Sequence, residues 1–378
     1  MALKEITADK GQYFDQERET LSKLREINDD HLIKPIAAYQ IKGNIHGCFL
    51  FPWAEGGNLR EFWQSDQQRP LKEHKMMCWV LKQLCGLCHA LTVLHERNCR
   101  HGDLKPENIL HFDEGDPPGT LRIAHVGLAK FHTVHTQQRL DLLQKTATNT
   151  ATLRYISPEF VRDDVIPRSF DVWSMGCIFL EFLIWTVYGP KQLKHFNALV
   201  FDHFWEKTNS GYVVHSQVKP WIDHLSKDLA GSQTALLELL NLIKDKMLVL
   251  KPTQTDKLVP GTFLAAEDAG RSDSHAVHQR LLEISRKANR VPKYALGEGK
   301  EKPGPPPPTT SSNGFLAPGY RGTPRPSLPS QQDSLGNHEI ILHVPAAGGN
   351  DSQVSTADRS DVERQVSKEK PLITFYVI

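Results

Sequence analysis

Three side chains suited to chemistry lie close together in a short loop between two apolar runs: Asp103, Lys105 and Asn108. A carboxylate can orient an attacking hydroxyl group, an ammonium group can neutralise charge on a moving phosphoryl group, and an amide oxygen can help to hold Mg²⁺. Phosphoryl transfer from ATP needs such a set. Asp and Asn in loops also cap turns, so each residue taken alone has a structural interpretation as well.

The surrounding stretch, Arg-His-Gly-Asp-Leu-Lys-Pro-Glu-Asn-Ile-Leu, resembles the catalytic loop of the eukaryotic protein kinases, His-Arg-Asp-Leu-x-x-x-x-Asn. The resemblance implies that Asp103 is the catalytic base, Lys105 the phosphate-neutralising cation and Asn108 a metal ligand that also contacts the nucleotide. It assigns His101 a structural role and places Leu110 at the nucleotide. The Lys two residues after the Asp resembles the Ser/Thr kinases rather than the Tyr kinases.

Two later motifs follow in the order and at the distance that this family shows. The stretch Thr-Leu-Arg-Tyr-Ile-Ser-Pro-Glu ends at Glu159 and is similar to the end of the kinase activation segment, Thr-x-x-Tyr-x-Ala-Pro-Glu. Asp171 opens Asp-Val-Trp-Ser-Met-Gly, which resembles the start of the central buried helix. Thr152 would then hydrogen-bond Asp103 and Lys105. Glu159 would anchor the segment to a later Arg, and Asp171 would bond the backbone of the catalytic loop.

The arginine that pairs with this glutamate usually comes three residues after a proline. Here Pro252 is followed by Thr255, and Arg271 comes only after an inserted-looking stretch, residues 255–270. Arg271 is therefore a displaced candidate for the partner of Glu159.

Two departures from the family pattern bear on activity. Gly102 stands where many members have an Arg that grips a phosphate on the activation loop, so switching by that route is not expected. His125, followed by Val126 and Gly127, stands where the family has Asp-Phe-Gly, whose Asp holds Mg²⁺ against the phosphates. Mg²⁺ prefers oxygen ligands, and a neutral imidazole is a poor substitute. Phosphoryl transfer is therefore expected to be severely weakened, with some rescue by Mn²⁺.

The N-terminal stretch Ala-Leu-Lys, which ends at Lys4, resembles the Ala-x-Lys of the third kinase strand. The resemblance implies that Lys4 grips the α- and β-phosphates and pairs with a Glu on the next helix. The helical spacing of apolar residues over 14–27 favours Glu17 as this partner, with Glu19 in reserve. The alternative is an ordinary N-terminal Lys.

A Gly-rich loop should precede this lysine and cover the phosphates, and no G-x-G-x-x-G occurs later in the chain. We expect either a fragment or truncated gene product, or a protein without this ATP lid.

Residues 31–38 and 47–53 are expected to form two strands, the second leading into the Glu-Gly-Gly-Asn-Leu of a hinge between lobes. Phe51 would lie at the back of the adenine pocket, with Trp53 and Ala54 offering backbone hydrogen bonds. Phe51 could also be a plain core aromatic residue, and the two interpretations can hold together.

Apolar periodicity predicts the elements that position these residues. They are helices over residues 75–97, 236–250 and 276–284, and a strand over residues 121–124.

The composition indicates which classes of binding partner and which cellular location to expect. Lys+Arg 45 against Asp+Glu 44 gives no electrostatic reason to expect nucleic acid or an anionic membrane as a partner. The N-terminus lacks the apolar core of a signal peptide, and no apolar run approaches the roughly 20 residues of a membrane span. The pair Cys85 and Cys88 lies in a helical pattern without a second pair, which favours buried thiols over a redox or zinc site. A cytoplasmic location is expected, and a nuclear one stays open.

The sequence thus predicts an α+β, two-lobed, protein-kinase-like fold. Residues 1–59 would form an incomplete, β-rich N-lobe with the Lys strand, C-helix and hinge, and residues 60–290 a large helical C-lobe. Residues 291–378, rich in Pro, Gly and Ser, are expected to be a largely disordered tail, in which residues 339–344 and 372–378 are strand-like and could pair or dock. A PxxP sequence at Pro326 is a weak candidate ligand for SH3-type modules.

Three interpretations remain open. The first is a divergent Ser/Thr protein kinase that uses ATP and a divalent ion on a protein substrate, and the second is a pseudokinase that binds or scaffolds a partner. The third is an incomplete gene product whose N-lobe lacks two strands. Asp103, Lys105 and Asn108 favour the first, and His125 with the missing Gly-rich loop favours the second. The oligomeric state is left open.

Overall fold

The computed structural model divides the chain into two compact units. The first contains residues 1–28, 33–53 and 320–378, and the second contains residues 29–32 and 54–319. The structure describes residues 1–7, 18, 21–22, 26–41, 46–65, 73–115, 118–125, 153–162, 168–209, 211–230, 234–250, 270–296, 339–340 and 373–376.

The first unit is built around an antiparallel sheet with the strand order β8-β1-β3-β2-β9. Phe49 of the central strand pairs with Lys4 on one side and with Ala38 on the other, and both Phe49 and Ala38 are fully buried. The strands are β1 (Ala2–Thr7), β2 (Ala37–Ile41), β3 (His46–Phe51), β8 (Glu339–Ile340) and β9 (Ile373–Tyr376).

The two outer strands come from the C-terminal part of the chain. Strand β9 pairs with β2 over four residues, from Ala38 opposite Tyr376 to Ile41 opposite Ile373. Strand β8 pairs with β1 over two residues. Of the segments expected to be strand-like, residues 339–340 and 373–376 form strands that pair with strands near the N-terminus, and the remaining residues lie outside the described part of the chain. Because an uncovered sheet edge exposes unpaired N–H and C=O groups, these segments shield both edges.

The strand expected over residues 31–38 was wrongly placed, because β2 begins only at Ala37. Pro35 explains the late start, since proline has no N–H to donate and restricts the residue before it. Before it, the Asp29 carboxylate accepts a hydrogen bond from the His31 N–H at 2.7 Å and bends the chain. Leu32 belongs to the second unit, where it forms an isolated parallel bridge with Ile123.

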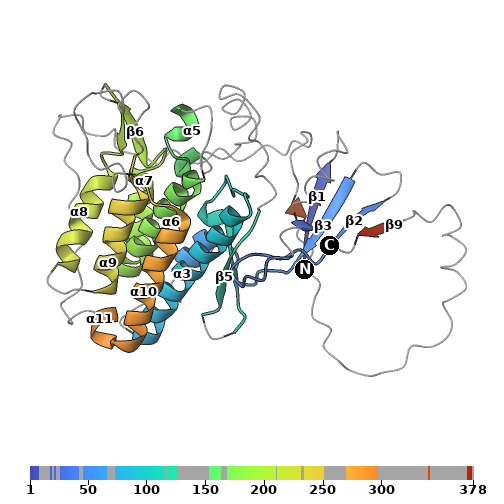
Figure 1. Cartoon of the computed structure of the whole chain (residues 1–378), viewed down its shortest axis with the longest axis horizontal. Coiled ribbons are helices and arrows are strands. Elements are labelled where there is room, and N and C mark those ends of the chain that lie inside the picture. Colours follow the sequence, from blue (N-terminus) through green and yellow to red (C-terminus); the bar gives the residue numbers. More distant parts are fainter. Residues whose placement is uncertain are drawn as a thin grey trace, which may run out of the picture. The chain divides into compact units, whose positions relative to one another are not determined.

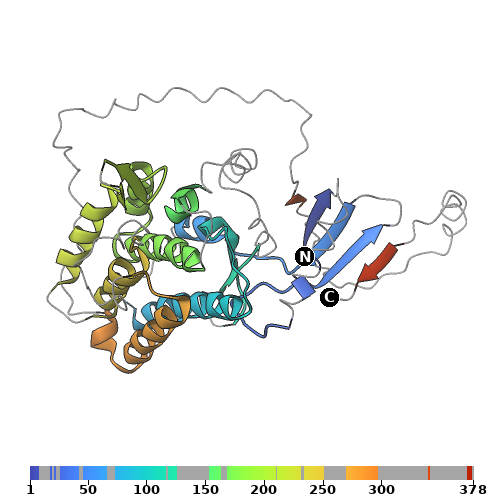
Figure 2. The ribbon, with the colours of Figure 1, turned by 45° about the horizontal axis from the view of Figure 1, so that its top comes forward.

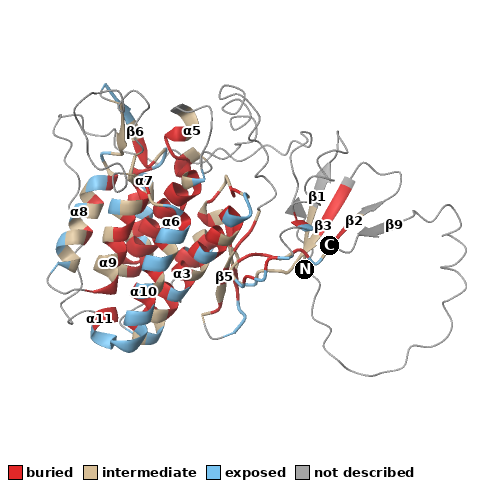
Figure 3. Ribbon diagram, viewed as in Figure 1, coloured by how far each residue is buried: buried red, intermediate tan, exposed pale blue. Residues whose placement is uncertain are grey.

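Four helices run side by side through the second unit (Figures 1 and 2). Helix α6 is apolar all round and buried along almost its whole length, as expected for the central helix of a core. Buried residues concentrate where these helices face one another (Figure 3). The four are α3 (His74–Glu96), α6 (Ser169–Tyr188), α9 (Ala235–Leu242) and α10 (Ser274–Arg290).

Smaller elements complete the second unit. They are α2 (Leu59–Gln64), α5 (Glu159–Arg162), α7 (Pro190–Leu199), α8 (Val218–Leu229) and α11 (Pro292–Leu296), the short 3₁₀ turns η2 (Pro106–Asn108) and η5 (Leu153–Tyr155), the π-helical turn η6 (Ile243–Met247), and the hairpins β4 (Ile109–Phe112) with β5 (Thr120–Ile123) and β6 (Trp205–Thr208) with β7 (Gly211–Val214).

The prediction of one helix over residues 236–250 was wrong in its second half. Helix α9 ends at Leu242, and the chain continues as η6, where the Leu248 N–H donates to the Ile243 carbonyl at 2.8 Å. The wider turn places Met247 and Leu248 against Gly176 of α6, where a Cβ on the glycine would lie 2.9 Å from the Met247 Cβ.

Two helices, α3 and α6, are long and apolar enough to cross a membrane by length and composition alone. Within the fold, most of α3 and almost the whole of α6 are buried, which is what core helices show.

Candidate active site

Helix α3 delivers the chain to the candidate catalytic loop through a defined C-terminal cap. Asn98 adopts a left-handed conformation with φ 57°. Its N–H donates to the His95 carbonyl at 3.1 Å, and the next N–H, of Cys99, donates to the Leu94 carbonyl at 2.9 Å. This pair of bonds is a Schellman motif, which satisfies the last carbonyls of the helix and fixes the exit of the chain.

Asp171, at the start of α6, holds the backbone of the catalytic loop. Its Oδ2 accepts from the His101 N–H at 2.9 Å and its Oδ1 from the Gly102 N–H at 2.8 Å. The same Oδ2 lies 2.9 Å from Nε2 of His95, whose Nδ1 lies 3.0 Å from the Ser274 hydroxyl. The predicted contact of Asp171 with the loop is therefore confirmed, and the residue is fully buried.

Gly102 adopts φ 78°, a left-handed conformation that favours glycine over any residue with a Cβ. A glycine at this position, where the resemblance implies an Arg, therefore suits the left-handed backbone that Gly102 adopts as its N–H donates to Asp171. From the sequence, Gly102 was noted only because it lacks the side chain with which an Arg would bind a phosphate on the activation loop.

His101 is fully buried and uses both ring nitrogens. Its Nε2 lies 2.8 Å from the Ala124 carbonyl, which can only accept, so Nε2 carries the hydrogen. The other nitrogen, Nδ1, accepts from the Asp103 N–H at 3.3 Å. The imidazole of His101 therefore ties the end of strand β5 to the residue expected to be the catalytic base.

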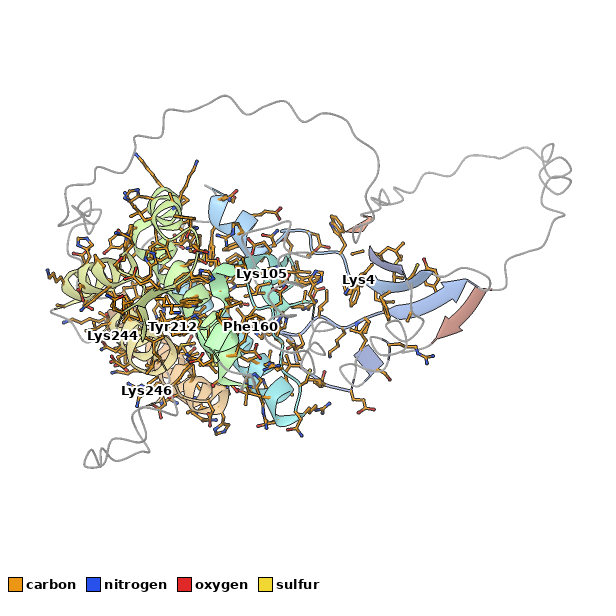
Figure 4. The ribbon with its side chains drawn as sticks, turned by 90° about the horizontal axis from the view of Figure 1, so that it is seen from above. Lys4, Lys105, Phe160, Tyr212, Lys244 and Lys246 are labelled. Carbon is orange, nitrogen blue, oxygen red and sulfur yellow. The ribbon has the colours of Figure 1, made fainter. Side chains whose placement is uncertain are left out.

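The structure brings Asp103, Lys105 and Asn108 together. Asp103 Oδ2 lies 3.1 Å from the Lys105 ammonium and accepts from Asn108 Nδ2 at 2.9 Å, while the same Nδ2 donates to the Asp103 carbonyl at 2.7 Å. Within the described part of the chain, Asp103 Oδ1 has no hydrogen-bond partner. One carboxylate oxygen is thus anchored, and the other is left as an acceptor. Figure 4 shows Lys105 among the side chains of the second unit.

The His125 backbone is strained. It has φ 64°, a conformation that is uncommon for a residue with a Cβ. The preceding Ala124 N–H donates to the Asn108 carbonyl at 2.8 Å, and its carbonyl accepts from His101. The end of strand β5 is therefore tied on both sides to the candidate catalytic loop, and the strain falls on the residue that stands where the resemblance implies a metal-binding Asp.

The donor set at this site does not fit Mg²⁺ well. The Asn108 amide donates both of its hydrogen bonds to Asp103 through Nδ2, which leaves its Oδ1 as the atom able to ligate a cation. The second position offers the imidazole of His125, which suits a softer ion than Mg²⁺. Among the described residues, no group of three or more His, Cys, Asp and Glu side chains could hold a metal ion.

The residues predicted to contact nucleotide come from β1, β3 and the turn after β3. Lys4 lies half-buried in β1, opposite Phe49 of β3. Phe51 ends β3, and Pro52 follows it, which stops the strand. Trp53 and Ala54 are half-buried, and the Ala54 carbonyl accepts from the Gly57 N–H at 3.2 Å, so it is already engaged in a turn.

Leu110 is half-buried in β4 and bridges Asn58, the N-cap of α2. The predicted roles of Glu17, Gly127 and Thr152 lie outside the described residues.

Glu159 and Arg271 form the predicted ion pair. Arg271 Nη2 lies 2.9 Å from Glu159 Oε1, and neither side chain is exposed to solvent. The guanidinium also donates to the carbonyls of Val249 and Ser169. Burial by itself would raise the pKa of Glu159, but the charge of Arg271 and hydrogen bonds to the carboxylate together outweigh burial and hold that pKa below its ordinary value.

A second charged cluster was not predicted from the sequence. Glu181 is fully buried on α6 and meets Arg154 at 3.0 Å and the Tyr155 hydroxyl at 2.7 Å. Arg60 lies beside them and binds Glu107 of the catalytic loop at 2.7 Å. One signal was available, since a single Glu within the otherwise apolar second half of α6 implies a buried charge with a partner.

The family model of the protein kinase domain matches residues 1–241. Serine/threonine-protein kinase PKH3 of Eremothecium gossypii is 30% identical over 204 residues, which are 53% of this chain and 26% of that protein. Human serine/threonine-protein kinase 16 is 29% identical over 187 residues, 47% of this chain and 58% of that protein. Serine/threonine-protein kinase nekl-2 of Caenorhabditis elegans is 26% identical over 275 residues, 66% of this chain and 71% of that protein. The chain thus spans less than two thirds of the length of the first two of these relatives.

Proposed function

The chain belongs to the protein kinase family, and we propose that it is a Ser/Thr protein kinase whose phosphoryl transfer is weak. The observation that carries this proposal is the arrangement of Asp103, with Oδ2 anchored by Lys105 and Asn108 while Oδ1 has no partner within the described residues. The Ser/Thr assignment is supported by the Lys after Asp-Leu and by the names of the relatives.

Asp103 Oδ1 would accept a hydrogen bond from the hydroxyl of a Ser or Thr in a protein substrate and orient it for attack. Lys105 holds the carboxylate in place and carries a positive charge that would offset negative charge on the phosphoryl group. Protein kinases use ATP and Mg²⁺, and Mg²⁺ would neutralise charge on the phosphates. Because His125 supplies an imidazole where this chemistry calls for a carboxylate, we expect a low rate, with Mn²⁺ preferred over Mg²⁺.

A pseudokinase that binds a partner protein is the second candidate function. The observation in its favour is the strained His125 at the metal position, since a residue held in an uncommon backbone conformation is often kept for a reason other than packing. We propose a protein partner or substrate and a cytoplasmic location in either case, and neither nucleic acid nor a membrane.

The test is transfer of labelled γ-phosphate to a generic basic protein and to the chain itself, with Mg²⁺ or with Mn²⁺. Variants Asp103→Asn and His125→Asp are run beside the wild type. Incorporation that is lost in Asp103→Asn would support a working kinase. A silent wild type with an active His125→Asp variant would favour the pseudokinase and show that the remaining site is sound. Silence from all three proteins would count against phosphoryl transfer by this chain.

A further inference from the structure

Arg60 of helix α2 contacts side chains from three other segments of the second unit. Its Nε donates to Glu107 Oε1 at 2.7 Å, and its Nη2 donates to the Tyr155 hydroxyl at 2.5 Å. Its Nη1 lies 3.8 Å from Oε1 of Glu181. A guanidinium can do this because its donors point in fixed, divergent directions, which a lysine ammonium cannot reproduce.

The groups that Arg60 contacts belong to two turns with separate duties. Glu107 lies in η2, directly before Asn108, whose amide anchors Asp103. Tyr155 ends η5, shortly before the Glu159 that pairs with Arg271. Arg60 therefore lies between the catalytic loop and the end of the segment that leads to Glu159.

The Tyr155 side of this network is anchored to the core. Tyr155 donates to Glu181 Oε2 at 2.7 Å, and its carbonyl accepts from the Ser174 hydroxyl at 2.8 Å. Arg154 supplies a second guanidinium to Glu181 at 3.0 Å. Burial and the neighbouring Glu181 raise the pKa of Tyr155 well above its ordinary value, so the hydroxyl stays neutral and keeps its hydrogen for the carboxylate.

The Glu107 side is open to the solvent by comparison. The Glu107 side chain is 31% exposed and that of Arg60 is 22% exposed, whereas Glu181 is fully buried. Burial lowers the pKa of Arg60, but Glu181, Tyr155 and Glu107 outweigh it, and Arg60 remains charged. The turn η2, in which Glu107 is partly exposed between the buried Pro106 and Asn108, is thus held to the turn η5 through one cation.

We propose that Arg60 is a positioning residue that couples the two turns, so that the placement of Asn108 and Asp103 depends on the placement of Tyr155, and the reverse. Its effect on phosphoryl transfer rests on the proposed function, whereas the coupling itself is a property of the fold. Glu107, Tyr155 and Arg60 would then behave as one unit when any of them is removed.

The coupling is tested by hydrogen exchange of backbone amides in the full 378-residue chain. The variants are Glu107→Ala, Tyr155→Phe, Arg60→Gln and Arg60→Lys, with Arg280→Gln as the matched control. Arg280 also pairs with two glutamates, but on the exposed surface of α10.

If Arg60 couples the turns, Glu107→Ala raises exchange in residues 153–162 as well as in 103–110, and Tyr155→Phe raises exchange in 103–110 as well as in 153–162. Neither change adds to the effect of Arg60→Gln when the two are combined, and Arg60→Lys fails to restore protection in both turns. Arg280→Gln leaves both segments unchanged. Glu107 is partly exposed, so its variant is expected to fold even if Tyr155→Phe does not.

Exchange that rises only in the segment that carries the substitution would overturn the proposal, as would a lysine at position 60 that protects both turns as well as arginine does. Where the wild type transfers phosphate, Arg60→Gln should lower kcat/KM on the order of tenfold to a hundredfold, as misplacement of catalytic groups does. A wild type without transfer would count against the proposed function only, because the exchange measurement decides the coupling without it.

Discussion

Glu159 and Arg271 form an ion pair that is fully shielded from solvent, although 112 positions separate them in the sequence. Each keeps the other from being a lone charge in the core, where an unpaired charge is costly. The pair joins the segment that follows Tyr155 to the start of α10 and is the longest-range charged contact that the sequence predicted.

Removal of one partner should therefore be far more damaging than removal of a surface pair. We expect Arg271→Met to lower the free energy of unfolding by about 3–5 kcal/mol, because it leaves the Glu159 carboxylate buried and uncompensated. The matched control is Arg122→Met, which breaks an Arg–Glu pair whose Glu114 side chain is 58% exposed and should cost about 0–1 kcal/mol. Urea denaturation of both variants decides the point. Equal losses would mean that the buried pair is no more important than the surface one.

The same pair predicts an acid dependence of stability. The pKa of Glu159 in the folded protein is lowered below its ordinary value of 4.5, so the unfolded chain takes up this proton first as the pH falls. The stabilisation is fully present above that ordinary pKa and is lost as the pH falls through the folded pKa. We expect the free energy of unfolding of the wild type to approach that of the double variant Glu159→Gln/Arg271→Met as the pH falls below the ordinary pKa of a glutamate. A difference that stays constant from neutral pH to acid would rule out Glu159 as the source.

Gly102 and His125 form a matched pair of left-handed positions, with φ 78° and 64°, of which only one is a glycine. We expect Gly102→Ala to cost about 1–2 kcal/mol, since a Cβ is disfavoured in this conformation. His125→Gly should gain about 0.5–1 kcal/mol, because strain relief exceeds the added entropy of the unfolded chain. Thermal unfolding of the two variants tests both signs, and a loss of stability in His125→Gly would show that the imidazole makes contacts worth more than the strain.

Gly176 allows helix α6 to approach the π-helical turn η6. An added Cβ would lie 2.9 Å from the Met247 Cβ and 3.1 Å from a Leu248 methyl carbon, so we expect Gly176→Ala to cost about 1–3 kcal/mol by overpacking. Gly270→Ala is the control, because nothing lies within 4 Å of a Cβ built there. Urea denaturation that finds the two variants equally stable would contradict a close approach that depends on the missing side chain.

Strand β9 should protect the amides of β2. Successive N–H groups of a strand point to opposite sides, so of Thr374→Pro and Phe375→Pro only one removes a donor that faces β2. We expect the variant that removes the donor facing β2 to raise hydrogen exchange in residues 38–41. The variant at the adjacent position should have a smaller effect and serves as the control. Unchanged exchange in both variants would mean that the pairing of β9 does not protect β2.

Motif spacing predicted the catalytic loop and the contact of Asp171 with it, because these residue types stand at fixed distances along the chain. Arg271 does not stand at the usual distance, and motif order alone made it a candidate partner of Glu159. Spacing could not find Arg60, since its partners Glu107 and Tyr155 come from segments that approach it only in the folded state. The start of β2 was missed because a single proline outweighed the apolar pattern around it. The π-helical turn was missed because it depends on the absence of a side chain at Gly176, on another helix.

The pairing of β8 and β9 with strands near the N-terminus has a consequence for biosynthesis. The ribosome releases β1, β2 and β3 before α2 to α11, and the residues of β8 and β9 only after these helices. The helical unit can fold as it emerges, because its contacts are made within residues 29–32 and 54–319. The β1 edge must instead wait until Ile340 has been made, and the β2 edge until Tyr376, which lies more than 300 residues after Phe51. During that interval the strand edges of the nascent chain can pair with chaperones or with other chains. The yield of folded protein should therefore depend on how fast translation reaches β9.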